Sequence, residues 1–301
     1  MKQRRADTPW ARRMAGPRTV STPVQVGAKG SRRHTKVGKA EGAKPQSGDE
    51  RCAHKIGEGM SEQALRQFGP AIWIAEGRPV SFFGFRYPTR MAIVKLIDGG
   101  LFVWSPVALS AALKVELDAL GPVQFVVSPS RLHHLFIAEW ASAYPDARRY
   151  AAPGLRKKRR DLIFDGELGD APEPEWASDI DQVSVRGSPL TEVEFFHYRS
   201  RTAIFADLIQ NLPRDWFQGW RAVAARVDGI CAPHPGAPRE WRAMFLNRRA
   251  ARASVERILA WPIERVLIAH GEPVTMEGGA FVRQAFTWLL GREHRLQRLP
   301  Q

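Results

Sequence analysis

The ten residues FVVSPSRLHH, numbered 125–134, indicate the architecture of this chain. Three apolar β-forming residues lead into a short polar loop, and the loop ends in the adjacent histidines His133 and His134. An apolar run of helical character follows at residues 135–144. A buried strand that opens into a polar loop is how α/β proteins present chemistry at the carboxyl end of a strand. The stretch therefore predicts a strand whose end carries a functional site.

Two later strands are predicted to end in the same way. Residues 203–206 form an apolar run that is followed by Asp207, and residues 266–269 form one that is followed by His270. Imidazole nitrogens and carboxylate oxygens are common ligands of protein-bound metals. Three predicted strands therefore end in side chains able to bind a metal, and we expect these ends to converge.

The rest of the chain alternates between strand-like and helix-like patterns. An Asp-Gly-Gly sequence at residues 98–100 separates two β-rich runs, residues 91–97 and 101–104, and predicts a hairpin turn. Leucines at helical spacing predict an amphipathic helix within residues 109–120. This mixture favours two layers of β-sheet covered by helices on the outside. The other predicted strands are at residues 72–74, 80–83, 148–152, 182–185, 192–198 and 202–206, the other helices at 135–143, 216–228, 239–260 and 281–290, and a long irregular connection at 155–175.

The basic character of the chain is concentrated at its start. Of the 45 lysines and arginines, 14 lie in residues 1–60 beside 5 acidic residues, which gives this leader +9 of the total net charge of +14. The leader lacks a periodic apolar pattern and is predicted to be disordered, whereas residues 61–301 are expected to form one folded domain. Three interpretations of the leader remain open: a dispensable tail with Met60 as the true start, a basic arm that binds nucleic acid or an acidic partner, and an organelle transit peptide.

Cysteine usage and hydropathy limit the class of protein. The two cysteines, Cys52 and Cys231, have no CxxC or zinc-finger spacing, which argues against a disulfide framework and favours a reducing, cytoplasmic compartment. No apolar run reaches the roughly 18–20 residues that a membrane span needs, and the leader has no signal-peptide h-region. A Gly-rich phosphate loop and a Gly-x-Ser-x-Gly sequence are both missing from the chain, so Walker-type nucleotide binding and serine hydrolase chemistry are unsupported.

Eight short stretches carry a resemblance to a known family. They are residues 81–85, 88–91, 104–106, 128–134, 144–145, 152–154, 202–207 and 269–271. In their order and spacing the chain resembles the metallo-β-lactamase fold, and most closely the domain-of-unknown-function family 4336 within that fold. The resemblance covers essentially the whole region predicted to be ordered. It implies an α+β fold of four layers, an αβ/βα sandwich.

Members of this fold that hydrolyse substrates carry a His-x-His-x-Asp-His motif after the strand that opens this section. Its positions fall on residues 129–134 of this chain. Pro129 and Arg131 replace the two histidines of the first metal site, and His133 replaces the aspartate. The last histidine of the motif, His134, is retained. The resemblance therefore does not carry a two-metal mechanism over to this chain.

The remaining family positions imply one metal site. Asp207 falls where the fold places its bridging aspartate, and His270 falls on its final histidine. The implied ligands are His134, Asp207 and His270, with His133 as a further one. Such a set suits one Zn, Fe or Mn ion, which would acidify a bound water for nucleophilic attack. The alternative is that the loop keeps its histidines for packing and binds no metal.

Basic residues near the predicted site bear on its substrate. Arg131 stands where it would neutralise an anionic group of a substrate. Residues 156–160 form a run of five basic residues, which is either a solvated surface or a contact for an anionic substrate or RNA phosphate. His197 lies within a predicted strand beside aromatic residues and is expected to be a surface or packing residue.

The sequence leaves three functional hypotheses open. The first is a one-metal hydrolase or oxidoreductase of unknown substrate, and the second is a non-catalytic binding or scaffolding relative of the fold. Metal analysis separates these two. The third is a nucleic-acid binder that acts through the basic leader, whose affinity would fall steeply with salt.

Overall fold

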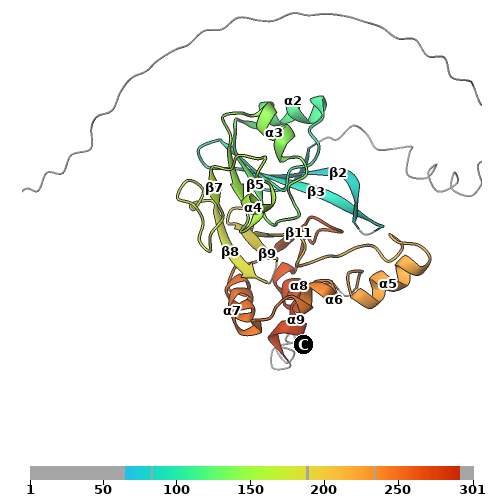
Figure 1. Cartoon of the computed structure of the whole chain (residues 1–301). Coiled ribbons are helices and arrows are strands. Elements are labelled where there is room, and N and C mark those ends of the chain that lie inside the picture. The colour runs from blue at the N-terminus through green and yellow to red at the C-terminus, as the bar shows by residue number, and fades with distance from the viewer. Residues whose placement is uncertain (1–64, 83, 188–189, 234, 292–301) are drawn as a thin grey trace, which may run out of the picture. The chain divides into compact units, whose positions relative to one another are not determined.

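Two β-sheets form the centre of the folded chain (Figure 1). The computed structural model describes residues 65–291 except 83, 188–189 and 234. The predicted leader, residues 1–60, lies outside the described residues. Within the described part of the chain, no helix is long and apolar enough to cross a bilayer.

The first sheet has seven strands that lie in chain order from β1 to β7. The pairs from β1 to β4 are antiparallel, and those from β4 to β7 are parallel. Pairing changes from antiparallel to parallel at β4. Helix α2 lies between β4 and β5 and returns the chain to the end of the sheet where β4 begins, so that β5 can run parallel to β4. The strands are β1 (Arg66–Gly69), β2 (Ile72–Phe82), β3 (Phe85–Lys95), β4 (Leu101–Trp104), β5 (Val123–Ser128), β6 (Arg148–Ala151) and β7 (Gly166–Glu167).

The second sheet has four strands in the order β11-β10-β9-β8. The hairpin partners β8 and β9, and β9 and β10, are antiparallel, whereas β10 and β11 are parallel. The long connection between β10 and β11 holds helices α5, α6 and α7. The strands are β8 (Ile180–Arg186), β9 (Thr191–His197), β10 (Thr202–Phe205) and β11 (Arg265–Ile268).

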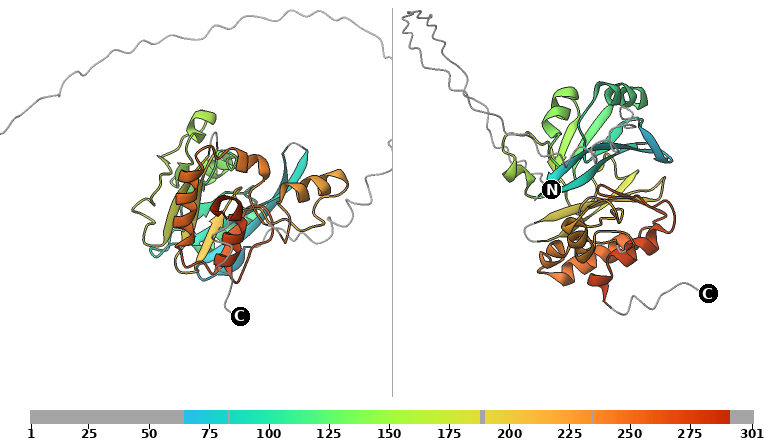
Figure 2. Two further views of the ribbon diagram at one scale, coloured as in Figure 1. Left: turned by 90° about the horizontal axis from the view of Figure 1, so that it is seen from below. Right: turned by 90° about the vertical axis from the view of Figure 1, so that its right-hand side faces the viewer.

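The sheets face each other, and helices cover their outer faces (Figure 2). Helices α2, α3 and α4 pack on the first sheet, and α6 to α9 pack on the second. This arrangement confirms the predicted four-layer sandwich. The helices are α2 (Ala111–Leu120), α3 (Ile137–Ala143), α4 (Leu155–Lys158), α5 (Trp220–Asp228), α6 (Arg239–Ala243), α7 (Arg248–Leu259), α8 (Gly278–Ala285) and α9 (Thr287–Leu290).

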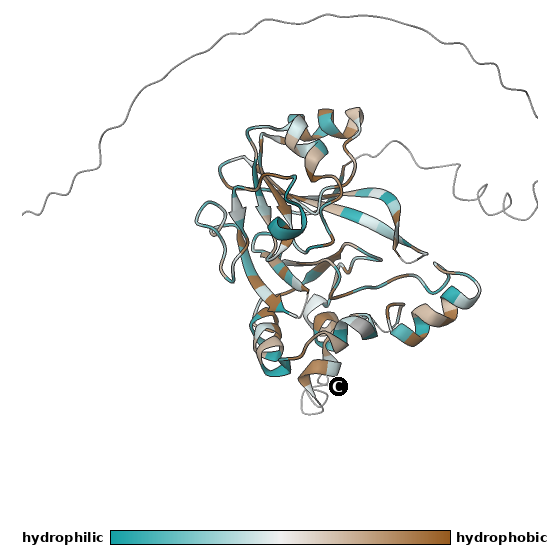
Figure 3. Cartoon of the chain, in the orientation of Figure 1, coloured by the Kyte–Doolittle hydropathy of each residue, from teal (hydrophilic) through white to brown (hydrophobic). Residues whose placement is uncertain are grey.

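Strand β5 shows why the opening stretch of the sequence is apolar without alternation. Phe125 and Val127 point into the core between the sheets, where they join Trp176 of the loop before β8. Val126 points the other way, into the core beneath α2 and α3. Because both faces of a central parallel strand are buried, every position in it favours an apolar side chain (Figure 3).

Most of the predicted elements are observed. Strand β1 was not predicted, β3 begins before the predicted run 91–97, and the helix predicted at 281–290 is divided into α8 and α9. Two further differences concern β2 and the connection after β6. The short strand expected at residues 72–74 and residues 80–82 of the one expected at 80–83 belong to the single strand β2, and residue 83 lies outside the described residues. The pairing of β2 with β3 continues across an irregularity between Gly77 and Val80. The connection expected to be irregular, residues 155–175, contains α4 and β7. Both differences arise because tertiary pairing extends order into segments that have little periodic apolar pattern of their own.

His197 at the end of β9 is a packing residue with no exposed surface. Its Nδ1 atom lies 2.7 Å from the hydroxyl of Ser200, which in turn lies 2.7 Å from the hydroxyl of Thr202. Burial lowers the pKa of His197 to about 4, so the ring is neutral at pH 7. This short polar chain fixes the turn that joins β9 to β10.

The buried ring predicts a loss of stability in acid. The folded pKa of about 4 lies below the ordinary value of 6.5, so the unfolded chain takes up a proton that the folded chain does not. The free energy of unfolding should therefore fall as pH decreases from 6.5 towards 4, with a contribution from His197 of at most ~1.4 kcal/mol per pH unit. In His197→Gln, urea denaturation should give a shallower decrease over this range. Equal slopes in both proteins would show that His197 is protonated in the folded state.

Candidate metal centre

Three strand ends meet at one rim of the sandwich. His133 lies in the loop after β5, Asp207 lies two residues beyond β10, and His270 lies two residues beyond β11. Strands β10 and β11 are parallel neighbours in which Phe205 pairs with Ile268. Equal offsets from this pair bring Asp207 and His270 side by side, and the loop of the other sheet adds His133.

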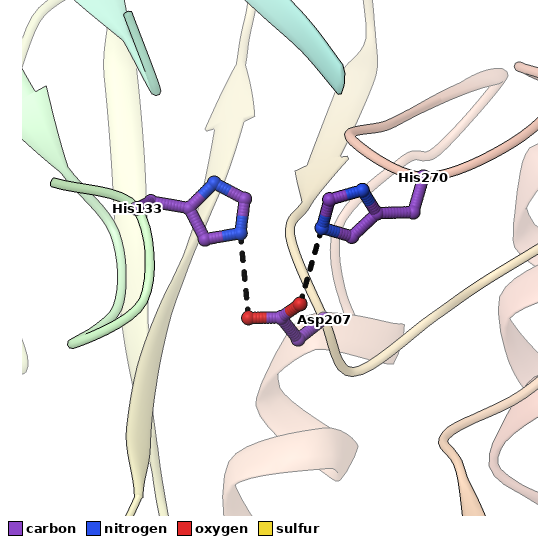
Figure 4. Close-up of side chains that lie close together, drawn as sticks. All are labelled: His133, Asp207 and His270. Atoms are coloured by element: carbon purple, nitrogen blue, oxygen red, sulfur yellow. Dashed lines mark ion pairs between the residues drawn. The ribbon is translucent and has the colours of Figure 1, made fainter. Parts of the chain in front are cut away.

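The three side chains point toward one another (Figure 4). His133 Nε2 lies 3.3 Å from Asp207 Oδ2, and His270 Nε2 lies 3.2 Å from Asp207 Oδ1. The three potential ligand atoms all lie within 4.8 Å of one another. Each of the side chains exposes less than a tenth of its surface, with values of 9% for both histidines and 7% for the aspartate. The arrangement is a candidate metal-binding group.

Hydrogen bonds on the far side of each ring orient the imidazoles. His270 Nδ1 lies 2.6 Å from the carbonyl oxygen of Pro88. Because a carbonyl only accepts, His270 Nδ1 carries the hydrogen and Nε2 is the atom offered to Asp207. His133 Nδ1 lies 2.6 Å from the hydroxyl of Ser105. Such partners are typical of metal-binding histidines, since they fix the tautomer and the ring direction.

The charge of Asp207 governs the electrostatics of the group. Burial opposes the ionised carboxylate, but the neighbouring imidazoles outweigh burial and lower the pKa of Asp207. Burial likewise opposes a charged His133 ring, and the carboxylate outweighs it and raises the pKa of His133. A lone pair on either Nε2 atom would repel the carboxylate oxygen beside it, so a cation belongs between them. That cation is either a proton on the ring or a metal ion.

Arg90 in β3 holds the chain on either side of His270. Its Nη1 atom donates to the carbonyl oxygens of Ile268, at 2.6 Å, and Gly271, at 2.5 Å. Its Nε atom donates to Glu76 at 2.8 Å. Gly271 has a φ of +123°, and a β-carbon there would lie 2.2 Å from the Asn211 carbonyl oxygen. The buried arginine and the tight glycine turn together position His270. The sequence analysis did not identify a role for either residue.

Glu192 holds the turn that carries Asp207. Its carboxylate accepts hydrogen bonds from the backbone N–H groups of Ala206, Asp207 and Leu208, at distances between 2.9 and 3.2 Å. Both Glu192 and its neighbour Glu194 on β9 are buried. Burial and the adjacent Glu192 charge raise the pKa of Glu194 well above its ordinary value. Of the two carboxyl groups, Glu194 is therefore the one whose surroundings favour the neutral form, whereas Glu192 accepts the backbone hydrogen bonds.

The structure places the other two predicted site residues outside this group. His134 Nδ1 lies 2.8 Å from the guanidinium of Arg159. Burial and the charges of Lys158 and Arg159 lower the pKa of His134 to about 4. The side chain of Arg131 lies against Gly154, and its carbonyl oxygen accepts a hydrogen bond from Lys158 at 2.9 Å. Adjacent residues in a loop point in different directions, which separates His133 from His134.

A match to a family model identifies the family of the chain. Residues 71–223 match the model of the family described as Domain of unknown function (DUF4336). The chain belongs to this family. The matched region includes His133, Asp207 and Glu192, and it ends before His270. No curated protein matches the sequence.

Solved structures share the fold of this family member. A metallo-beta-lactamase from Pontibacter korlensis is 10% identical, with a TM-score of 0.52 over 77% of this chain and 100% of its own. DIM-1 metallo-beta-lactamase exposed to ceftazidime is 13% identical, with a TM-score of 0.51 over 74% and 95%. FIM-1 from Pseudomonas aeruginosa, in its mono-zinc form, is 10% identical, with a TM-score of 0.50 over 76% and 97%. The chain has the metallo-β-lactamase fold, as its sequence predicted.

The two buried glutamates are predicted to respond differently to neutralisation. Glu192→Gln removes the charge that three amides share, so it should lower the free energy of unfolding by about 1–3 kcal/mol. Because the Asp207 turn would loosen, Zn²⁺ affinity should fall roughly tenfold. Glu194→Gln resembles the neutral carboxyl already present and should change both quantities less. Urea denaturation and zinc titration measure the two effects, and an equal or larger effect of Glu194→Gln would show that the charge resides on Glu194.

Proposed function

We propose that this protein is a hydrolase that uses one divalent metal ion, held by His133, Asp207 and His270. The meeting of two imidazole Nε2 atoms with one buried carboxylate supports this proposal most directly. The Nδ1–H group of His270 donates to the Pro88 carbonyl oxygen. In the neutral ring the Nε2 lone pair is then directed at the space between His133, Asp207 and His270. The residues therefore fit a cation in both charge and direction.

The donor set suits a borderline metal. Two imidazoles and one carboxylate are compatible with Zn²⁺, and with Fe or Mn. Three protein ligands leave a position open for water or substrate, which is the pattern of catalytic rather than structural zinc sites. When bound, such an ion lowers the pKa of a coordinated water and polarises an acyl or phosphoryl oxygen.

The surrounding side chains supply orientation and exclude solvent. Ser130 donates to Asp207 Oδ2 at 3.3 Å, so this oxygen is held from two sides, by Ser130 and by His133. Ser105 and Pro88 keep the two rings from turning away. The low exposure of all three ligands strengthens their electrostatic interaction with a reacting group.

A single ion agrees with the loop after β5. Pro129 offers no metal ligand, and Arg131 carries a positive charge that would repel a second ion. His134 is bonded to Arg159. The solved FIM-1 structure is of a mono-zinc form, so a protein of this fold holds one zinc ion. We assign Arg131 to the substrate side of the site, where its charge would face an anionic group.

Metal analysis tests the ligand set. The purified protein, supplied with Zn²⁺ and desalted, should retain about one ion per chain by plasma mass spectrometry. His133→Ala and His270→Ala should each weaken zinc binding by at least the ~10–100-fold that loss of an outer partner causes. His134→Ala is the matched control and should retain zinc, because this ring bonds to Arg159. Parallel loading with Fe²⁺ and Mn²⁺ identifies the preferred ion.

Hydrolysis is tested on the same proteins. A panel of chromogenic carboxylic, phosphoric and sulfuric esters and lactams should include a substrate whose cleavage stops with a chelator and returns with metal. A wild-type protein without stoichiometric metal would favour the non-catalytic relative of the fold instead. Equal loss of zinc in His134→Ala and His133→Ala would mean that the ligand set proposed above is wrong.

A further inference from the structure

The run of five basic residues begins in helix α4 and continues through the two residues after it, and the structure divides the five into two groups. Three are tied to the fold: Arg156 donates to the Phe164 carbonyl, Lys158 to the Arg131 carbonyl, and Arg159 contacts His134 and Asp161. In the described part of the chain, the exposed Lys157 and Arg160 form no side-chain hydrogen bond or ion pair. The run is therefore only partly a solvated surface.

Three cations gather where α4 meets the loop after β5. Lys158 Nζ lies 2.9 Å from the backbone oxygen of Arg131. A β-carbon on Gly154, the residue before α4, would lie 3.4 Å from Arg131 Cδ and 3.6 Å from its Nε. Burial, followed by the charges of Arg131 and Arg159, lowers the pKa of Lys158. Neighbouring cations repel one another, so an anion placed among them would be favourable.

The same short loop links these cations to the candidate metal centre. Ser130 Oγ and His133 Nε2 both reach Asp207, while His134 Nδ1 reaches Arg159. Arg131 lies between Ser130 and His133 in sequence. The loop thus contacts the metal-binding group through Ser130 and His133, and it contacts Lys158 and Arg159 through the Arg131 backbone and His134, so the cations adjoin the metal-binding group.

We propose that Arg131, Lys158 and Arg159 form an anion subsite beside the metal centre, which receives a phosphate-type oxyanion of a small substrate. The assignment of this anion to the substrate rests on the proposed hydrolase function, whereas anion binding itself does not. Guanidinium and ammonium groups together suit an oxyanion, because the guanidinium fork binds two oxygens and the ammonium adds a third donor.

Asp161 already shows how Arg159 binds an oxyanion. Its two carboxylate oxygens lie 2.9 and 3.2 Å from Arg159 Nε, and Oδ2 lies 2.6 Å from Nη2. The Asp161 side chain is 62% exposed, and exposed ion pairs of this kind contribute little to stability. An incoming oxyanion can therefore replace the aspartate on the guanidinium.

The subsite suits a small oxyanion better than a nucleic-acid strand. Its cations come from one loop and one short helix, whereas a strand needs a track of cations with aromatic side chains for the bases. The exposed apolar residues of these segments, Leu135 and Ile163, are aliphatic. They provide no stacking surface for bases.

Calorimetric titration with inorganic phosphate tests the subsite. The full chain should bind phosphate both in the presence of a chelator and with Zn²⁺ bound. Lys158→Ala should weaken phosphate binding about tenfold, as expected for loss of one charged donor. Lys157→Ala is the matched control, since it removes the same charge from the same helix turn, and it should change binding by less than about twofold. An equal effect of both variants would overturn the subsite.

Asp161→Asn provides a test in the opposite direction. The variant should bind phosphate a few-fold more tightly, because an amide competes less well than a carboxylate for Arg159. Unchanged or weaker binding would contradict the displacement of Asp161. A single-stranded oligonucleotide that binds the wild type over a hundredfold more tightly than phosphate, and depends on Lys158, would overturn the assignment to a small substrate.

The outcomes for the subsite and for the hydrolase are separate. A wild-type protein that holds zinc through His133 and His270 but does not bind phosphate would overturn the subsite and leave the metal centre. A protein that binds phosphate through Lys158 without retaining metal would support the subsite and remove the hydrolase.

Discussion

The buried carboxylate of Asp207 is the charge on which the site depends. An isolated ion in a protein interior is strongly unfavourable, so its neighbours must supply hydrogen bonds and opposite charge. His133 and His270 supply the charge, and Ser130 supplies a hydrogen bond. Without a metal, a proton on the His133 ring helps to meet this need, since the carboxylate raises the pKa of that ring. Metal binding would displace this proton, so the same arrangement that stabilises the carboxylate also prepares a site for a cation.

Regular strands, rather than loops alone, fix the position of each ligand. Ser105 directly follows β4 and contacts His133, Pro88 in β3 contacts His270, and Glu192 in β9 holds the Asp207 turn. The two sheets thus approach the site from both sides, and the core between them sets the spacing. A site supported in this way keeps its geometry better than one that relies on loop side chains.

The sequence predicted the parts of the site that depend on local pattern. Apolar runs ending in Asp207 and His270 identify two strands, and parallel pairing then brings these residues together. The resemblance put His134 before His133 as a ligand, whereas the structure brings His133 to Asp207 and His134 to Arg159. The direction of a loop side chain depends on contacts that local pattern does not encode. Arg90 went unrecognised for a related reason, since it binds the carbonyl of Ile268, 178 residues further along the chain.

Pro129 and Arg131 depart from the motif of hydrolases of this fold. The positive charge at this position is kept, but the chemistry of a metal ion is replaced by that of a guanidinium. In hydrolases of this fold, as the resemblance implies, histidines at these positions belong to the first of two metal sites. Arg131 instead carries a fixed positive charge, and Lys158 and Arg159 reinforce it. A guanidinium can bind an oxyanion through its N–H groups, but it cannot coordinate water or lower its pKa as a metal does. In the mechanism we propose, one ion held by His133, Asp207 and His270 would activate the nucleophile and fixed cations would bind the substrate, so anion binding would not depend on a second metal.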